Sequence, residues 1–178
     1  MIRKLMASAA VVALSTASLS TFAADPDGGD IHFKGKILEK TCTVAVNGVV
    51  SPAIPSIPLP DANTTVLRFA GNTTGDTPFT LSLKDCKTNA SNAEVRFTSL
   101  YLDGDQLRNT APTGPADNVA LELTDNSGNP LDLQGVTPTN IPLTAGAGSA
   151  VYKVRYYAKA AVTPGAVEGT AMYIISYP

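Results

Sequence analysis

Apolar and polar residues alternate along several short stretches of this chain, with the two-residue period of a β-strand. Three stretches show the alternation most clearly: Phe79–Leu83, Val119–Thr124 and Val151–Ala160. In the first, the odd positions are apolar, and in the third, Tyr152 and Val154 share one face. The pattern predicts a β-strand at each place, with one face of each strand turned toward a core.

Five further stretches are strand-like: Ile31–Leu38, Thr41–Val46, Thr64–Phe69, Ala93–Leu102 and Gly169–Tyr177. In Ala93–Leu102, Val95 and Phe97 share one face. The intervening region Val49–Pro60 contains Pro52, Pro55, Pro58 and Pro60. Because proline lacks the amide that a ladder needs, we expect an extended edge segment or a loop there. Polar turn sequences separate these stretches, and strong helical periodicity is missing, so the chain is predicted to fold as an all-β sandwich.

The final stretch differs from the others because both of its faces are fairly apolar. Tyr173, Ile175 and Tyr177 lie on one face, and Met172 and Ile174 lie on the other. This pattern favours a strand that is buried within the sandwich or covered by another chain.

Residues 1–23 have the features of a secretory signal peptide. Two basic residues near the start precede an apolar run that extends through Leu19, and Thr21-Phe22-Ala23 supplies a small-x-small cleavage site. We place the cut after Ala23, with cleavage after Ala24 as the alternative. A transmembrane anchor is disfavoured because the apolar run is short and interrupted by Ser and Thr. The protein is therefore predicted to be exported.

The composition and the missing motifs of the chain exclude several classes of function. Of the 178 residues, 6% are aromatic and none is Trp, which disfavours a stacking platform for sugars or bases, and the net charge of −2 gives no sign of nucleic-acid binding. His32 is the only histidine, and we find no catalytic triad, metal-ligand cluster or phosphate loop. We therefore predict that the protein is not an enzyme and has no cofactor.

The two cysteines, Cys42 and Cys86, both follow the predicted signal peptide. A pair of cysteines in an exported protein predicts a disulfide.

The segment Gly28–Gly35 follows the leader and alternates like a strand. Ile31 and Phe33 lie on one face, and Gly29 and Gly35 extend that face with positions that carry no side chain. Glycine weakens a strand inside its own sheet, so its use here favours a strand that approaches another backbone closely.

Four features taken together resemble the type 1 fimbrial family, the chaperone–usher pilins of Gram-negative bacteria, and most closely their major shaft subunits. They are the segment Gly28–Gly35 soon after the leader, Cys42 in Lys-Thr-Cys-Thr-Val, Cys86 at the end of Phe-Thr-Leu-Ser-Leu-Lys-Asp-Cys, and a final strand with a penultimate Tyr177. The resemblance covers the whole mature chain. It implies an incomplete immunoglobulin-like β-sandwich that is completed by a donor strand from another subunit.

The resemblance also implies the organisation of the chain and its partners. Residues 24–36 would form the N-terminal donor-strand extension and residues 37–178 the pilin domain. Other copies and related pilins, a periplasmic chaperone and an outer-membrane usher would be its partners, and the product would be a fimbria at the cell surface that supports adhesion.

The resemblance assigns roles to individual residues. Gly29, Ile31, Phe33 and Gly35 would enter the groove of a neighbour, while four C-terminal residues would border the acceptor groove and be recognised by the chaperone: Tyr173, Ile175, Tyr177 and Pro178. Two departures from the family pattern are the terminal Pro178, which lacks an amide donor, and the acidic start of the donor segment at Asp25-Pro26-Asp27.

Three alternatives stay open at this point. A minor or adaptor pilin would share every motif. A sugar-binding tip adhesin is less expected, because such proteins carry a lectin domain ahead of the pilin domain, whereas here the donor-like segment directly follows the leader. A self-contained periplasmic binding module or enzyme would belong to a different class and would fold without a chaperone.

Overall fold

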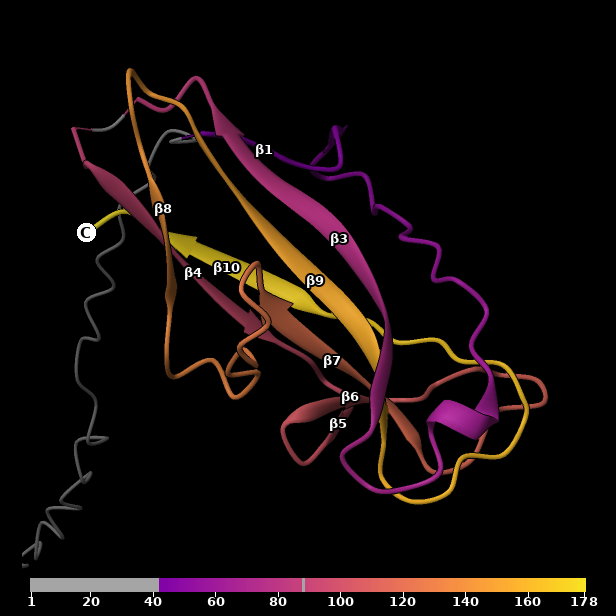
Figure 1. The fold of residues 1–178 in the computed structure, drawn as a ribbon. Helices are drawn as coiled ribbons and strands as arrows, with labels where there is room; N and C mark the ends of the chain where they lie inside the picture. Colours follow the sequence, from indigo (N-terminus) through magenta and orange to yellow (C-terminus); the bar gives the residue numbers. More distant parts are fainter. Residues whose placement is uncertain (1–41, 88) are drawn as a thin grey trace, which may run out of the picture. The chain divides into compact units, whose positions relative to one another are not determined.

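The computed structural model of the protein describes residues 42–87 and 89–178, which form two antiparallel β-sheets (Figure 1). Four predictions fall on residues 1–41 and lie outside the described residues: the signal peptide, the strand Ile31–Leu38, the segment Gly28–Gly35 and the boundary after residue 36. The predicted all-β sandwich is confirmed.

The larger sheet has seven strands, and the smaller has three. In spatial order the larger contains β2 (Val49–Val50), β1 (Thr43–Val46), β3 (Thr73–Lys84), β9 (Gly148–Ala158), β7 (Val119–Asp125), β6 (Gln106–Arg108) and β5 (Leu102–Asp103). The smaller contains β10 (Met172–Ser176), β4 (Asn92–Thr98) and β8 (Thr139–Pro142). The long β3–β9 pair forms the middle of the larger sheet, and β4 forms the middle of the smaller one (Figure 1).

The hydrophobic core contains side chains from both sheets. Phe79 and Tyr152 come from the larger sheet and Phe97 from the smaller, and the ring centroids of Phe97 and Tyr152 are 4.9 Å apart in an edge-on arrangement. The Tyr152 hydroxyl is hydrogen-bonded to that of Thr139 at 2.8 Å, and burial raises the pKa of Tyr152. The three rings therefore join the two layers by contacts that aromatic pairs favour.

Several sequence-based predictions of strands are confirmed. Phe79, Leu81 and Leu83 are buried on one face of β3, and Val95 and Phe97 are buried on one face of β4. The alternation identified these strands because one face of each packs on the core and the other does not.

The predicted strand Thr64–Phe69 is wrong. Thr64–Val66 forms a 3₁₀ helix, η1, and the Asn63 side-chain oxygen accepts a hydrogen bond from the Thr65 amide at 2.9 Å. This local side-chain bond gives the backbone an alternative to a sheet ladder, and the β-branched composition of the stretch concealed it.

Other predicted strands differ in extent. The predicted Ala93–Leu102 stops at Thr98, and the predicted Gly169–Tyr177 begins only at Met172. Strand β8 was not predicted, since it is short and ends in Pro142. It lies at the edge of the smaller sheet, where a proline is tolerated.

A network of charged side chains connects three strands of the larger sheet. The Arg155 Nε donates to Glu122 Oε2 at 2.8 Å, a second Arg155 nitrogen lies 2.6 Å from the same oxygen, and Asp76 lies 3.8 Å from Arg155. The Glu122 side chain is only 5% exposed. A carboxylate buried this deeply has lost its hydration, and the interaction with Arg155 offsets the free energy that this loss costs.

Removal of the arginine charge tests this network. We expect Arg155→Met to lower the free energy of unfolding by about 3–5 kcal/mol, because Glu122 is left buried without its partner. Lys159→Met is the control, since its partner Asp103 at 3.4 Å is 47% exposed and can be solvated, and it should cost less than about 1 kcal/mol. Urea unfolding of both variants gives the comparison, and equal losses would contradict the assignment.

The predicted disulfide between Cys42 and Cys86 is present in the structure. It ties the residue before β1 to the residues that follow β3, and Cys42 is buried in the core. The Cys86 amide also donates to the Gly146 carbonyl at 2.9 Å, which holds this end of β3 close to the turn before β9.

We expect the double change Cys42→Ala and Cys86→Ala to lower the free energy of unfolding by about 4 kcal/mol, because the unfolded chain gains the freedom of an open loop. Chemical denaturation measures this loss. Addition of a reductant should bring the wild-type chain to the stability of the variant and leave the variant unchanged. A variant as stable as the oxidised wild type would contradict the expectation.

Candidate functional site

A groove of about 1180 Å³ lies beside the last strand of the chain. Strand β10 pairs with β4 along one edge, and within the described residues its other edge has no partner. The groove therefore combines a free strand edge with an opening into the fold.

The floor of the groove is the hydrophobic core itself. Core side chains from both sheets line it, among them Phe79, Phe97, Leu107, Leu121, Leu123 and Val154. The groove thus reaches the core, and its lining includes side chains from both sheets. An opening of this kind is suited to binding apolar side chains.

One wall of the groove is the segment 54–60, which we call the proline wall. Its burial alternates as in a strand, with Pro55, Ile57 and Leu59 half-buried and Ile54 91% exposed. Ile57 and Leu59 pack against the core. No strand forms over residues 54–60, in agreement with the edge segment or loop expected for the proline-rich stretch.

The chain is held at both ends of the proline wall. The Ser51 amide donates to the Val44 carbonyl at 3.0 Å, and the Tyr156 hydroxyl donates to the Pro60 carbonyl at 3.1 Å. Burial and the negative charge of Asp61 both raise the pKa of Tyr156, so its hydroxyl stays protonated as a donor at neutral pH.

The opposite wall consists of β10 and the segment 162–171 before it. Of the predicted acceptor residues, Tyr173 lines the groove and packs against the core. Ile175 and Tyr177 pack against the core on the same side but do not line the groove, and Pro178 is exposed at the chain end. Ile174, on the other face of the strand, is 59% exposed.

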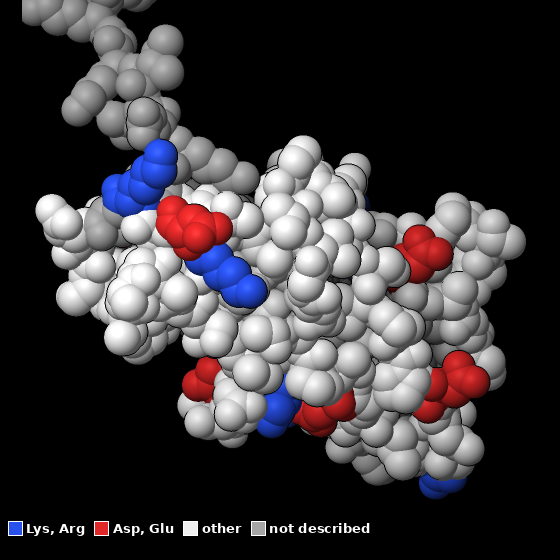
Figure 2. Space-filling view, turned by 90° about the horizontal axis from the view of Figure 1, so that it is seen from above, with Lys and Arg blue, Asp and Glu red and all other residues white. Residues whose placement is uncertain are grey.

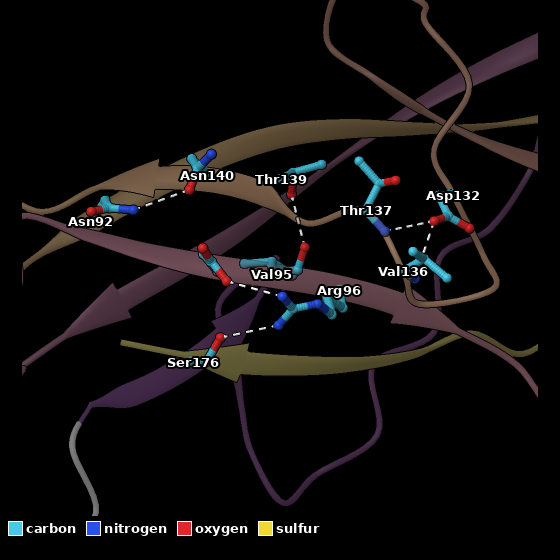
Figure 3. A network of polar contacts seen from close by, with 10 residues as sticks. Asn92, Val95, Arg96, Asp132, Val136, Thr137, Thr139, Asn140 and Ser176 are labelled. Carbon is cyan, nitrogen blue, oxygen red and sulfur yellow. Dashed lines mark hydrogen bonds and ion pairs between the residues drawn. The ribbon is translucent and has the colours of Figure 1, made fainter. Parts of the chain in front are cut away.

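Side-chain contacts fix β10 to the rest of the smaller sheet (Figure 3). Arg96 on β4 donates to the Ser176 hydroxyl at 3.4 Å and pairs with Glu94 at 3.2 Å. The Ser99 hydroxyl donates to the Thr170 carbonyl at 2.7 Å, just before β10 begins. These contacts hold one edge of β10 firmly and leave the opposite edge available.

The segment before β10 is held by Asn109. Its side-chain nitrogen donates to the carbonyls of Ala116 and Ala166 at 3.0 and 2.9 Å, and its oxygen accepts from the Glu168 amide at 3.0 Å. No local pattern in the sequence marks an asparagine that bridges distant loops, so Asn109 was not predicted. The alternation of apolar residues did place Phe79 and Phe97 on core faces, although not in a groove.

The groove offers packing surfaces and backbone groups, with few ionisable side chains. Asp61 and Glu168 are the carboxylates among its lining residues, and no group of acidic, His or Cys side chains in the described chain has the geometry of a metal site. On the face shown in Figure 2, acidic and basic side chains form small separate groups on a largely uncharged surface. The groove, with its apolar lining and few charges, is suited to binding a polypeptide strand by packing and main-chain hydrogen bonds.

The predicted donor residues Gly29, Ile31, Phe33 and Gly35 lie outside the described residues. No helix in the described part of the chain is long and apolar enough to cross a membrane.

Comparison with known proteins connects this geometry to a family. A family model described as "Fimbrial protein" matches residues 31–178. The type-1 fimbrial protein A chain of Escherichia coli is 32% identical, with 94% of this chain and 96% of that protein covered. The major fimbrial subunit SMF-1 of Stenotrophomonas maltophilia is 33% identical, with 92% and 99% covered.

Solved structures share the fold. The P pilus rod subunit PapA superposes with a TM-score of 0.61 at 19% identity, and 78% of this chain and all of that chain are covered. An antigen and type I fimbria protein of Burkholderia pseudomallei gives a TM-score of 0.56 at 27% identity, with 77% and 94% covered. By its sequence match along most of its length and by its incomplete sandwich, the chain belongs to the fimbrial protein family.

Proposed function

We propose that this protein is a shaft-forming structural subunit of a fimbria that polymerises by donor-strand exchange. The observation that carries the proposal is the groove between the free edge of β10 and the proline wall, with the apolar core as its floor. Its relatives over most of their length are fimbrial subunits, including a major one. The subunit is exported to the cell surface as part of the fimbria.

The free edge of β10 supports a strand as the occupant of the groove. An unpaired strand edge presents amides and carbonyls that a guest strand satisfies by β-augmentation, and alternate side chains of the guest then point toward the floor. Phe79, Phe97 and Leu121 would receive these side chains. The guest strand completes the sandwich and closes the core.

Residues 28–35 of a second copy are the proposed guest. This segment offers Ile31 and Phe33 on one face, while His32 and Lys34 on the other face would remain in solvent. Burial of the two apolar side chains contributes about 3–6 kcal/mol. Gly29 and Gly35 on the same face allow close approach to the floor at both ends of the segment.

A periplasmic chaperone and an outer-membrane usher are proposed as assembly partners. An empty groove exposes both an unpaired edge and apolar core, two features that promote aggregation, so a newly exported subunit needs a temporary occupant. The C-terminal residues Tyr177 and Pro178, at the end of β10, are the proposed recognition point for the chaperone. Removal of residues 1–23 would leave residues 24–36 as the N-terminal extension.

We expect Gly29→Leu to block donation while the folded domain is spared, because the added side chain meets the groove floor. Fibre yield, measured by electron microscopy and by the ladder of undissociated polymers on gels, should fall by about tenfold or more. His32→Leu is the matched control, since it adds an apolar side chain to the opposite face of the same segment and should still assemble.

A fusion gives an independent test of the same assignment. Residues 28–35 appended after Pro178 through a flexible linker should yield a soluble monomer with a raised melting temperature, because the guest strand becomes intramolecular. Normal polymerisation of Gly29→Leu, together with no gain of stability in the fusion, would rule out the donor-strand assignment.

Deletion of Ser176–Pro178 tests the acceptor side. The deletion removes Tyr177 from the core and the Ser176 hydroxyl from Arg96, so we expect loss of chaperone capture followed by aggregation or proteolysis. Ile174→Ala is the control, since it changes the 59% exposed face of the same strand and leaves the C-terminal end intact. Immunoblots of soluble periplasmic protein give the readout. A soluble truncated subunit with normal fibres would contradict the proposal.

A further inference from the structure

The proline wall resembles a β-strand in its burial pattern but has few of a strand's hydrogen-bond donors. Its side chains alternate between half-buried and exposed, as in an edge strand. None of its amides donates a hydrogen bond to another described residue, and Pro55, Pro58 and Pro60 have no amide hydrogen to donate. The segment is held by its two ends and by the packing of Ile57 and Leu59 instead.

Prolines interrupt the row of backbone amide donors along both lateral edges of this segment. In an extended chain, successive residues direct their amides alternately to the two lateral sides. Residues 54, 56, 58 and 60 share one side, and residues 55, 57 and 59 share the other. Pro58 and Pro60 lie in the first set and Pro55 in the second, so whichever side faces the groove lacks a continuous row of donors.

If both walls of an empty groove carried a full row of hydrogen-bonding groups, the two walls would be able to pair with each other. A groove that admits one strand separates its edges by two strand spacings, and approach by one spacing of about 4.8 Å would bring β10 and the opposite wall into pairing distance. Such closure would satisfy the free edge of β10 and cover the core. It would also exclude the guest strand.

We propose that the prolines of the proline wall prevent this closure and thereby keep the edge of β10 available to the guest strand. The inference rests on the proposed function and identifies Pro55 and Pro58 as candidate positioning residues for strand uptake. The groove accordingly has one hydrogen-bonding wall, β10, and one packing wall, formed by Ile57 and Leu59.

The test uses the mature chain, residues 24–178, with Gly29→Leu to prevent donation between copies. The chain is refolded from denaturant by dilution to low concentration, so that aggregation through the empty groove, which needs two copies to meet, is slow during the measurement. Into this host we introduce Pro55→Ala and Pro58→Ala, singly and together. Amide hydrogen exchange of β10 measures closure in the empty subunit. Association and dissociation of a labelled synthetic peptide of residues 24–36 measure uptake.

We expect the double variant to slow exchange of the β10 amides by roughly tenfold and to lower the association rate of the peptide by a similar factor, because closure reduces the competent fraction. The dissociation rate of the peptide should not increase. A general loss of stability, by contrast, would increase it. Because Pro55 and Pro58 belong to opposite lateral sets, one single variant should account for most of the effect. The control is the double variant Pro112→Ala and Pro130→Ala, because both prolines are exposed and lie outside the groove. It also removes two prolines, so the entropy of its unfolded chain rises by a similar amount.

Exchange and association rates equal to those of the control would overturn the inference, as would equal effects of the two single variants. Failure of the peptide to bind the host would contradict the proposed function, while the exchange of β10 would still decide whether the prolines oppose closure. A variant that fails to fold is recognised by fast exchange throughout β3 and β9, and the remaining single variant then decides.

Discussion

The structure depends on a hydrophobic core that its described strands do not fully cover. Core side chains form the floor of a groove, and the strand beside it, β10, is paired along one edge only. Because apolar surface and unpaired backbone groups lie in one place, binding of a further strand there is strongly favourable. The rest of the fold stabilises this arrangement: the Phe79–Phe97–Tyr152 contacts join the layers, and the disulfide fixes β1 to β3.

Alternation in the sequence predicted the strands that bury one face. It identified the inward residues of β3 and β4, because their pattern reflects a core on one side and solvent on the other. It failed for Thr64–Phe69, where the Asn63 cap favoured a 3₁₀ turn, and for β8, whose ladder to β4 is a long-range interaction. Edge strands this short carry too few residues for a period to be visible.

The candidate site was only partly predictable. The strand carrying Tyr173 and the proline-rich segment both stood out in the sequence, but their position on opposite walls of one groove comes from tertiary packing. Asn109 shows the limit most clearly, because it joins loops that are far apart in the chain and no local residue pattern marks such a bridge. Ile175 and Tyr177 followed the predicted face yet support the core outside the groove lining.

The pairing of β10 with β4 also has a consequence for the speed of folding. The two strands lie far apart in the sequence, so their contact closes a long loop. Contacts of this kind slow folding, because the entropy of loop closure is lost before the contact stabilises the chain. One wall of the binding groove therefore depends on a contact of the slow class, and the groove is complete only once this contact has formed.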